Sequence, residues 1–252
     1  MENADRTKHM CAIAAACLLC DLFEGNADRF HFQSAGAGGK RVCAIRKYTD
    51  ESTEVVRSET GRCIKEITVC DRLGCGGKDE GAVSDDGKLE EKEYNLAVVK
   101  EIARLLEQSG VKVYCTRTTD RTVSKKARVR LANKRQADML VSVHCNASDA
   151  RKHFVRGIEV LYSKRDNGAG YTNKQLAAKL LKKTVAATGL PARGVIRRED
   201  LYLMHHAKVP AVIVETGYLT NPSDYLYMRQ EKGIRQTAWG IYQAVMETLE
   251  KY

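Results

Sequence analysis

The sequence predicts an α/β domain over residues 65–252, a single domain with a mostly parallel central sheet of about six strands flanked by helices. Two observations lead to this fold class. From Glu66 onward, short apolar β-type runs alternate with longer segments whose apolar residues recur at helical spacing. Polar residues follow directly on several of these runs, as they do where parallel sheets hold their sites.

Each element of this domain is expected from a local pattern. Strands are expected at 67–70, 111–116, 139–144, 157–162, 201–204 and 211–214. Helices are expected at 91–106, 127–135, 176–185 and 234–249. Gly110 ends the first helix, and Gly189 followed by Pro191 ends the third, because glycine and proline commonly terminate helices.

The N-terminal part of the chain lacks this regularity. Residues 24–64 show no sustained period and contain a glycine-rich stretch, so they are interpreted as a linker or irregular extension. The apolar run Met10–Cys20 follows Arg6 and Lys8, as in a secretory signal or a short anchor. The run is shorter than the roughly 20 residues that cross a bilayer, so residues 1–23 are interpreted only as a weak signal or anchor segment.

The composition is that of a globular protein with a basic surface. Of 252 residues, 43% are hydrophobic and 29% charged, which excludes a protein with many membrane spans. Lys and Arg outnumber Asp and Glu by 42 to 32, which favours an anionic partner such as nucleic acid, anionic lipid or an acidic wall polymer. The nine cysteines lack paired CxxC motifs, so neither a disulfide scaffold nor a zinc ribbon is indicated.

Four polar clusters at strand ends or helix starts contain Cys75, Glu91, His144 and Glu215. A catalytic zinc ion takes three protein ligands from His, Cys, Asp or Glu and keeps one position open for water. The first three residues have side chains suited to such ligands. Glu215 could accept a proton from the metal-bound water, so the set has the groups that metal-assisted amide hydrolysis needs.

A purely structural explanation stays open for each of these residues taken alone. The helix dipole favours a carboxylate such as Glu91 at a helix start. His144 can be a hydrogen-bonded residue at a strand end, and Cys75 can be a small residue in a glycine turn. Glu215 is harder to explain in this way, because it follows a buried strand and an unpaired buried carboxylate is costly.

Five motifs resemble those of the zinc-dependent N-acetylmuramoyl-L-alanine amidases, which are cell-wall hydrolases with a phosphorylase/hydrolase-like fold. The family patterns are Glu-Lys-x-x-Asn-Leu, Thr-Arg-x-x-Asp, Arg-x-x-x-Ala-Asn, Ser-x-His-x-Asn-Ala and Pro-Ala-x-x-x-Glu-x-Gly-Phe-x-x-Asn. They correspond in order to residues 91–96, 116–120, 128–133, 142–147 and 210–221, the last with Tyr in place of Phe. The resemblance covers the chain from about Ile67 to Tyr252.

The resemblance implies a role for each residue of the site. Glu215 would activate water and pass a proton to the leaving amine. The substrate would be the amide between the lactyl group of N-acetylmuramic acid and the L-alanine of the peptidoglycan stem peptide. Ligands of Zn²⁺ would be Cys75, Glu91 and His144. The resemblance extends a substrate-binding role to Asn146, Arg128 and Asn133.

The first zinc-ligand motif departs from the family pattern. The family has Asp-x-Gly-His-Gly-Gly, whereas here Cys75 replaces the histidine and one extra residue separates Asp71 from Gly74. Either Cys75 binds zinc as a thiolate, or the chain is a catalytically weakened or inactive amidase-fold protein that binds peptidoglycan. We favour the thiolate, because the flanking glycines and the segments around Glu91 and Glu215 are retained.

The resemblance also sets expectations for partners and location. The partner would be peptidoglycan, with anionic wall polymers meeting the basic surface and a regulatory protein partner as a further expectation. The location would be extracytoplasmic, at the cell wall or in secreted form. Binding of nucleic acid is not expected, because only 6% of the residues are aromatic and no zinc-finger spacing is present.

Overall fold

The computed structural model describes residues 30–35, 42–49, 52–58, 66–71, 76–77, 79–149, 153–165 and 167–252. The expected signal or anchor segment at 1–23 lies outside the described residues, and so does Cys75. The described strands form two sheets, one of three strands and one of six.

The six-stranded sheet has the strand order β5-β4-β6-β9-β7-β8. Four of its five neighbouring strand pairs are parallel, and only the β7–β9 pair is antiparallel. This confirms the predicted sheet of about six mostly parallel strands. The strands are β4 (Glu66–Asp71), β5 (Lys112–Cys115), β6 (Met139–Asn146), β7 (Ile158–Tyr162), β8 (Ala192–Arg197) and β9 (Ala211–Tyr218).

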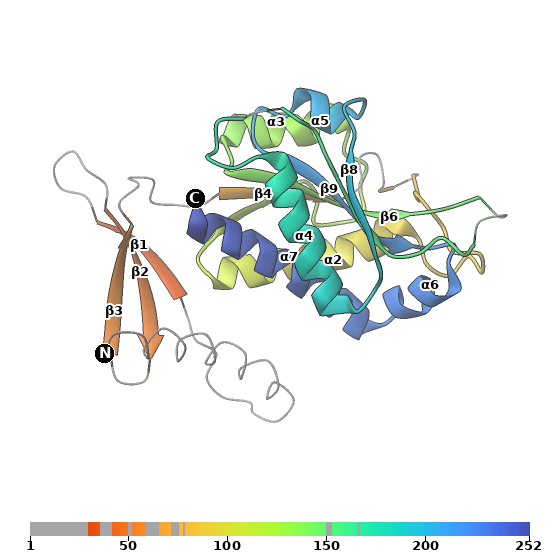
Figure 1. Ribbon diagram of the computed structural model, residues 1–252, viewed down its shortest axis with the longest axis horizontal. Helices are drawn as coiled ribbons and strands as arrows, with labels where there is room; N and C mark the ends of the chain where they lie inside the picture. Colours follow the sequence, from red (N-terminus) through yellow and green to blue (C-terminus); the bar gives the residue numbers. More distant parts are fainter. Residues whose placement is uncertain are drawn as a thin grey trace, which may run out of the picture.

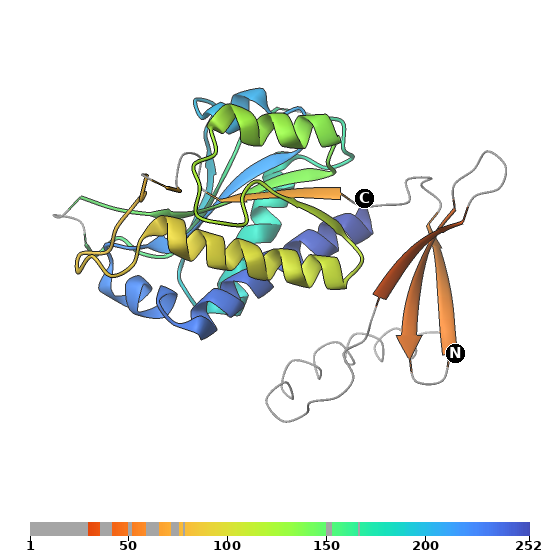
Figure 2. The same cartoon turned by 180° about the vertical axis from the view of Figure 1, so that it is seen from behind.

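Helices cover both faces of this sheet (Figures 1 and 2). One face packs against α2 (Glu91–Gln108), α4 (Asn173–Thr188) and α7 (Glu231–Lys251), and the other against α3 (Lys125–Arg135) and α5 (Tyr202–His206). A short helix, α6 (Pro222–Met228), follows β9. Strands β6 and β9 are buried over nearly their whole length because they lie between these two layers.

The helices begin and end at residues that satisfy their free backbone groups. At the start of α4, Thr172 and Gln175 form a capping box, and Gly189 ends the helix with a left-handed φ of 72°. The Ser124 side chain accepts a hydrogen bond from the Ala127 amide and so caps α3. In α2, the residues buried against the sheet recur every four positions from Tyr94 to Leu106, the period of one helical face.

The prediction of a strand at 201–204 is wrong. Residues Tyr202–His206 form α5 instead, and the strand of this region is β8, which precedes it. An apolar run of four residues fits a strand or a helical turn equally well, because it is too short to establish a period. Here Leu203 and Met204 are both buried as neighbours in one core cluster, an arrangement that a strand with alternating faces does not provide.

The interpretation of residues 24–64 as irregular is also corrected. Three strands lie within it, β1 (Phe30–Ala35), β2 (Val42–Thr49) and β3 (Ser52–Ser58), and they pair in sequence as an antiparallel sheet. The strands are six to eight residues long. Short strands that pair one after another need no hydrophobic period that continues across the turns between them. The lack of a sustained period over residues 24–64 therefore did not exclude strands.

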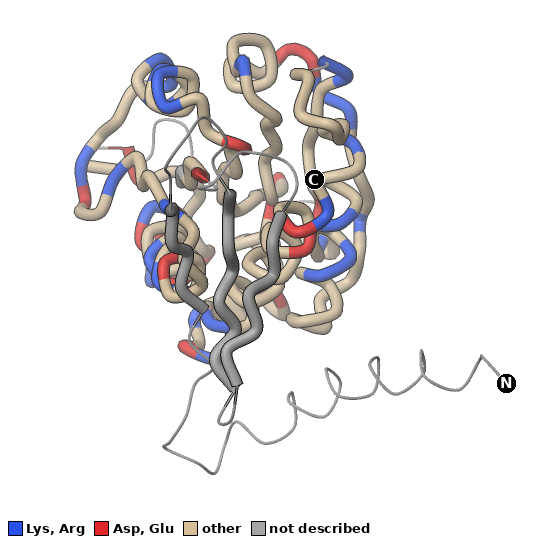
Figure 3. Tube along the Cα trace, turned by 90° about the vertical axis from the view of Figure 1, so that its left-hand side faces the viewer, with Lys and Arg blue, Asp and Glu red and all other residues tan. Residues whose placement is uncertain are grey.

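Charged residues are distributed over several elements of the domain. In the view of Figure 3, Lys and Arg occur on several helices and loops, with Asp and Glu placed among them. Within the part of the chain that the structure describes, no helix combines the length and the apolar character needed to cross a membrane.

Candidate active site

Two of the predicted site residues are brought together by strand register. Strands β6 and β9 are parallel neighbours in which His144 pairs with Glu215, so both side chains lie on the same face of the sheet. The Nδ1 atom of His144 is 3.9 Å from Oε1 of Glu215 and 3.8 Å from Oε1 of Glu91. The imidazole therefore lies between two carboxylates that are distant in sequence.

Glu91, the first residue of α2, is fully buried with its carboxylate held by three donors. Its Oε2 accepts a hydrogen bond from the Ala82 amide at 2.9 Å. Its Oε1 accepts from the Cys145 amide at 3.0 Å and from Nδ2 of Asn95 at 3.2 Å. These bonds offset the cost of burying the charge and fix the carboxylate beside His144.

The orientation of the His144 imidazole is fixed by a hydrogen bond with Ser142. The Oγ atom of Ser142 lies 2.9 Å from Nε2 of the ring, and the Thr216 hydroxyl donates to the His144 carbonyl at 2.8 Å. With Nε2 hydrogen-bonded to Ser142, the other ring nitrogen, Nδ1, faces the carboxylates of Glu91 and Glu215. A histidine whose second nitrogen is held by a hydrogen bond is the usual arrangement for a metal ligand.

The donor atoms of Glu91 and His144 fit a shared zinc ion. Two ligands at about 2.0–2.2 Å from zinc can be at most roughly 4.3 Å apart, and the two atoms here are 3.8 Å apart. Among the residues that the structure describes, no group of three His, Cys, Asp or Glu side chains is placed to hold a metal. The predicted third ligand, Cys75, lies outside those residues and stays a prediction.

The glycine turn that follows Cys75 in sequence is clamped by neighbouring loops. The Gly77 amide donates to Oδ1 of Asp120 at 2.7 Å, and the Thr122 hydroxyl donates to the Gly76 carbonyl at 2.6 Å. Nζ of Lys92 donates to the Gly77 carbonyl at 3.2 Å. The Gly77 amide and the charge of Lys92 hold the pKa of Asp120 below its usual value, so its carboxylate stays ionised. These bonds fix the backbone directly after the predicted ligand.

Gly76→Ala is expected to destabilise the fold by about 1–3 kcal/mol and to displace this turn. Gly76 has a φ of 125°, and a Cβ atom there would lie 2.2 Å from the Arg121 carbonyl oxygen. Gly87→Ala is the matched control, since Gly87 also has a left-handed φ, of 70°, but no atom within 4 Å of the added carbon. Urea unfolding should show a clearly larger loss for Gly76→Ala; equal losses would contradict the steric argument.

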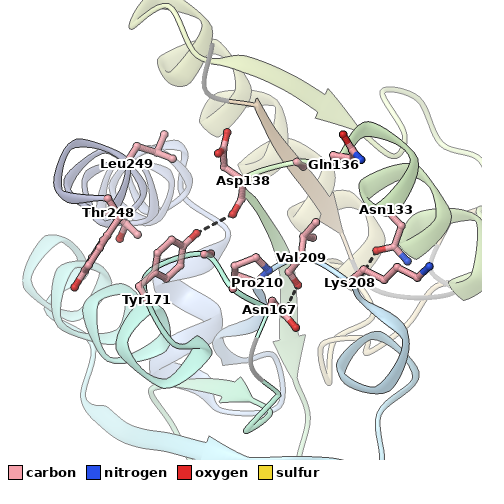
Figure 4. A pocket seen from close by; sticks show the side chains of 14 residues that line it. Asn133, Gln136, Asp138, Asn167, Tyr171, Lys208, Val209, Pro210, Thr248 and Leu249 are labelled. Carbon is pink, nitrogen blue, oxygen red and sulfur yellow. Dashed lines mark hydrogen bonds between the residues drawn. The ribbon is translucent and has the colours of Figure 1, made fainter. Parts of the chain in front are cut away.

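The structure does not bring Arg128 and Asn133 to this site, in contrast to the substrate-binding roles expected for them. Arg128 has no exposed surface, and its guanidinium donates to the Thr116 hydroxyl at 2.9 Å and to the Val123 carbonyl at 3.0 Å. Asn133 bonds the backbone of His206 and Lys208 and lines a cavity of about 570 Å³ at the amino ends of β6 and β9 (Figure 4). Arg128 therefore holds the loop between β5 and α3, whereas Asn133 holds the loop that precedes β9.

Asn146 does lie at the site, where it contacts a residue that the sequence patterns did not single out. Its Nδ2 donates to Oε1 of Glu159 at 2.8 Å, and Arg193 pairs with the other oxygen of Glu159 at 3.1 Å. Glu159 lies opposite Glu215 in the antiparallel β7–β9 pair. The position of Glu159 depends on the strand order and on the reversed direction of β7, which local sequence does not reveal.

A cavity of about 470 Å³ opens beside these residues. Its lining includes both His144 and Glu215, so a ligand in it would meet the two side chains directly. The other lining residues are Gly81, Ala82, Lys125, Cys145, Asn146, Ala147, Leu161, Arg198, Leu201, Tyr202 and Ile213. The cavity is the natural place for a substrate in this part of the molecule.

Comparison with known proteins gives matches over the same region. The family model described as N-acetylmuramoyl-L-alanine amidase matches residues 71–247. The chain is 34% identical over 157 residues to the N-acetylmuramoyl-L-alanine amidase LytC of Bacillus subtilis. That match covers 62% of this chain and 30% of LytC, so the chain spans less than a third of that relative.

Solved structures show the same fold. The structure of an N-acetylmuramoyl-L-alanine amidase from Clostridium difficile 630 matches with a TM-score of 0.67 and 32% identity, covering 74% of this chain and 97% of that one. The CwlD amidase from Clostridioides difficile, solved in complex with the GerS lipoprotein, matches with a TM-score of 0.67 and 27% identity. That match covers 75% of this chain and 100% of CwlD.

Proposed function

Because the chain belongs to the N-acetylmuramoyl-L-alanine amidase family, we propose that it hydrolyses the amide between N-acetylmuramic acid and L-alanine of peptidoglycan stem peptides, with zinc as cofactor. The observation that carries the proposal is the position of His144, whose Nδ1 lies within 4 Å of the carboxylates of both Glu91 and Glu215. This arrangement supplies two zinc ligands and one base, and two of the three residues, His144 and Glu215, line one cavity.

Each residue has a distinct role in this proposal. Glu91 and His144, with Cys75 as the third ligand, would hold the zinc ion, which when bound polarises the scissile carbonyl and makes water more acidic. Glu215 takes the proton of the attacking water and delivers it to the nitrogen of the leaving L-alanine. Asn146, oriented by Glu159, would donate its remaining amide proton to the substrate.

The assay for this function measures new amino termini in purified peptidoglycan. Hydrolysis at the proposed bond releases stem peptides that begin with a free L-alanine amine, while the glycan strands stay intact. Appearance of N-terminal L-alanine with time and enzyme concentration is the expected result. Binding to peptidoglycan without this release would instead support the weakened or inactive amidase-fold protein that the replacement of histidine by Cys75 allows.

Zinc content tests the role of Cys75 directly. We expect near-stoichiometric zinc in the purified chain and in Cys75→His, and a large loss in Cys75→Ser, because a serine hydroxyl is a far poorer zinc ligand than a thiolate or an imidazole. Metal is measured by mass spectrometry after dialysis. Equal, near-zero zinc in the wild type and Cys75→Ser would refute the thiolate ligand.

The place of action and the partners follow from the proposed substrate. Hydrolysis of peptidoglycan requires a location outside the cytoplasm, at the cell wall or in secreted form. Excess positive charge, with Lys and Arg at 42 against 32 for Asp and Glu, would favour contact with anionic wall polymers. The complex of the CwlD amidase with the GerS lipoprotein supports a regulatory protein partner for this chain as well.

A further inference from the structure

Two apolar side chains, Leu161 and Ile213, line the cavity beside Glu215 and are called its apolar floor. Ile213 precedes Glu215 by two residues on β9, and Leu161 of β7 pairs with Ile213 in the sheet. Both side chains line the cavity together with Glu215. Two residues along a strand correspond to about 7 Å, so the floor extends roughly that far from the proposed base.

Two cationic side chains line the same cavity, Lys125 and Arg198. Nε and Nη2 of Arg198 donate to the two carboxylate oxygens of Asp200, at 2.8 and 2.7 Å. These two parallel hydrogen bonds fix the plane of the guanidinium group. Its third nitrogen, Nη1, donates to no residue that the structure describes. The side chain is 42% exposed, so Nη1 can be reached from the cavity.

Arg198 and the proposed base Glu215 line the same cavity. The hydrogen bond between Arg198 and Asp200 is the main cause that raises the pKa of Arg198, and the charges of Glu159 and Glu215 contribute to the same rise.

Lys125 supplies a second positive charge to this cavity. It is the exposed first residue of α3, and its ammonium group forms no ion pair with any residue in the described ranges. Lys92, by comparison, pairs with both Glu90 and Asp120. An unpaired cation that lines a cavity can bind an anionic ligand without first breaking an internal contact.

We propose that Lys125 and Arg198 form a subsite for the carboxylate of the stem-peptide residue that follows L-alanine. This inference rests on the proposed amidase function and names the form of the substrate. In peptidoglycan that residue is a D-glutamate joined through its side chain, so its α-carboxyl group is either a free carboxylate or an amide. The chain would then prefer the free acid.

The length of the apolar segment beside Glu215 fits this assignment. Successive Cα atoms lie about 3.8 Å apart, so the α-carboxylate of the second residue lies roughly two residue spacings from the scissile amide. The apolar floor of Leu161 and Ile213 spans a similar length and would take the methyl group of L-alanine. Arg198 and Lys125 are the two Lys or Arg side chains that line this cavity, and the proposal assigns the carboxylate to them.

The test compares N-acetylmuramoyl-L-alanyl-D-glutamate with its α-amide as substrates. A hydrogen-bonded charge contact corresponds to a preference for the acid of roughly ten-fold or more in kcat/KM. In K125Q and R198Q the ratio of acid to amide should fall, and in the double variant it should approach one. The matched controls are K126Q and R197Q, which remove the same charges at neighbouring exposed positions that do not line the cavity, and they should keep the wild-type ratio.

Binding provides a readout that does not depend on turnover. In Glu215→Gln, calorimetry should show tighter binding of the acid than of the amide, and adding K125Q and R198Q should remove the difference. If the wild-type protein cleaves both compounds with equal kcat/KM, the amidase proposal stands but the proposed carboxylate subsite is overturned. Equal loss of the ratio in the control variants would also overturn it, because the effect would then come from overall charge. Cleavage of neither compound would overturn the amidase proposal itself.

Discussion

Glu215→Gln is expected to lower kcat for peptidoglycan hydrolysis by about 10²–10⁴-fold, the usual contribution of a positioned general base. Glutamine has nearly the same shape as glutamate, but its amide cannot accept the proton of the attacking water. Glu215 lies on the central strand β9 beside His144, with its Oε1 atom 3.9 Å from Nδ1 of the imidazole. The change therefore removes the proton acceptor and keeps the size of the side chain.

The measurement is the rate of release of N-terminal L-alanine at saturating peptidoglycan, with zinc content and thermal unfolding determined on the same protein. Glu93→Gln is the control, because Glu93 is an exposed carboxylate in the first turn of α2 and lies outside the cavity. We expect Glu93→Gln to retain wild-type activity. Undiminished hydrolysis by a folded, zinc-loaded Glu215→Gln protein would rule out Glu215 as the base.

Glu91→Gln is expected to cause the largest combined loss, of zinc and of stability. The buried carboxylate accepts hydrogen bonds from two backbone amides and from Asn95, so both of its oxygens are needed as acceptors. A glutamine places an NH₂ group against one of these donors, and a buried unsatisfied donor costs about 1–3 kcal/mol. The neutral amide is also a weak zinc ligand, so bound zinc should fall to near background.

Urea unfolding in the presence of a metal chelator separates the two effects of Glu91→Gln. The stability loss should persist in chelator, because it arises from the hydrogen bonds and not from zinc. Glu90→Gln is the matched control: Glu90 is the preceding, partly exposed carboxylate, and it pairs with Lys92 at 3.0 Å. Such a pair contributes about 0–1 kcal/mol, so Glu90→Gln should have little effect. Equal stability of wild type and Glu91→Gln in chelator would contradict the proposed anchoring of the carboxylate.

The parts of the site that the sequence predicted are those set by single segments. Glu91 opens a helix with a clear apolar period, and His144 and Glu215 each come near the end of a buried strand. Parallel strands with adjacent positions in a sheet bring their carboxyl ends to one edge. Each local signal alone still allowed a structural explanation, and it was the resemblance to the amidase family that assigned these residues to one site. The resemblance also implied substrate-binding roles for Arg128 and Asn133, but Arg128 has no exposed surface and Asn133 lines the cavity at the opposite end of the sheet.

By itself, the sequence determined the fold class, the four long helices α2, α3, α4 and α7, and five of the six strands of the larger sheet, because burial period, helix caps and glycine stops are properties of neighbouring residues. Only the tertiary structure decided that β7 runs antiparallel to β9, that residues 202–206 are helical, and that Glu159 lies opposite Glu215. It also decided that Lys125 and Arg198 line one cavity with Glu215. These features depend on which strands pair and in which direction. Strand pairing and strand direction are determined by packing between segments distant in sequence, and this packing produces no periodic pattern within each segment.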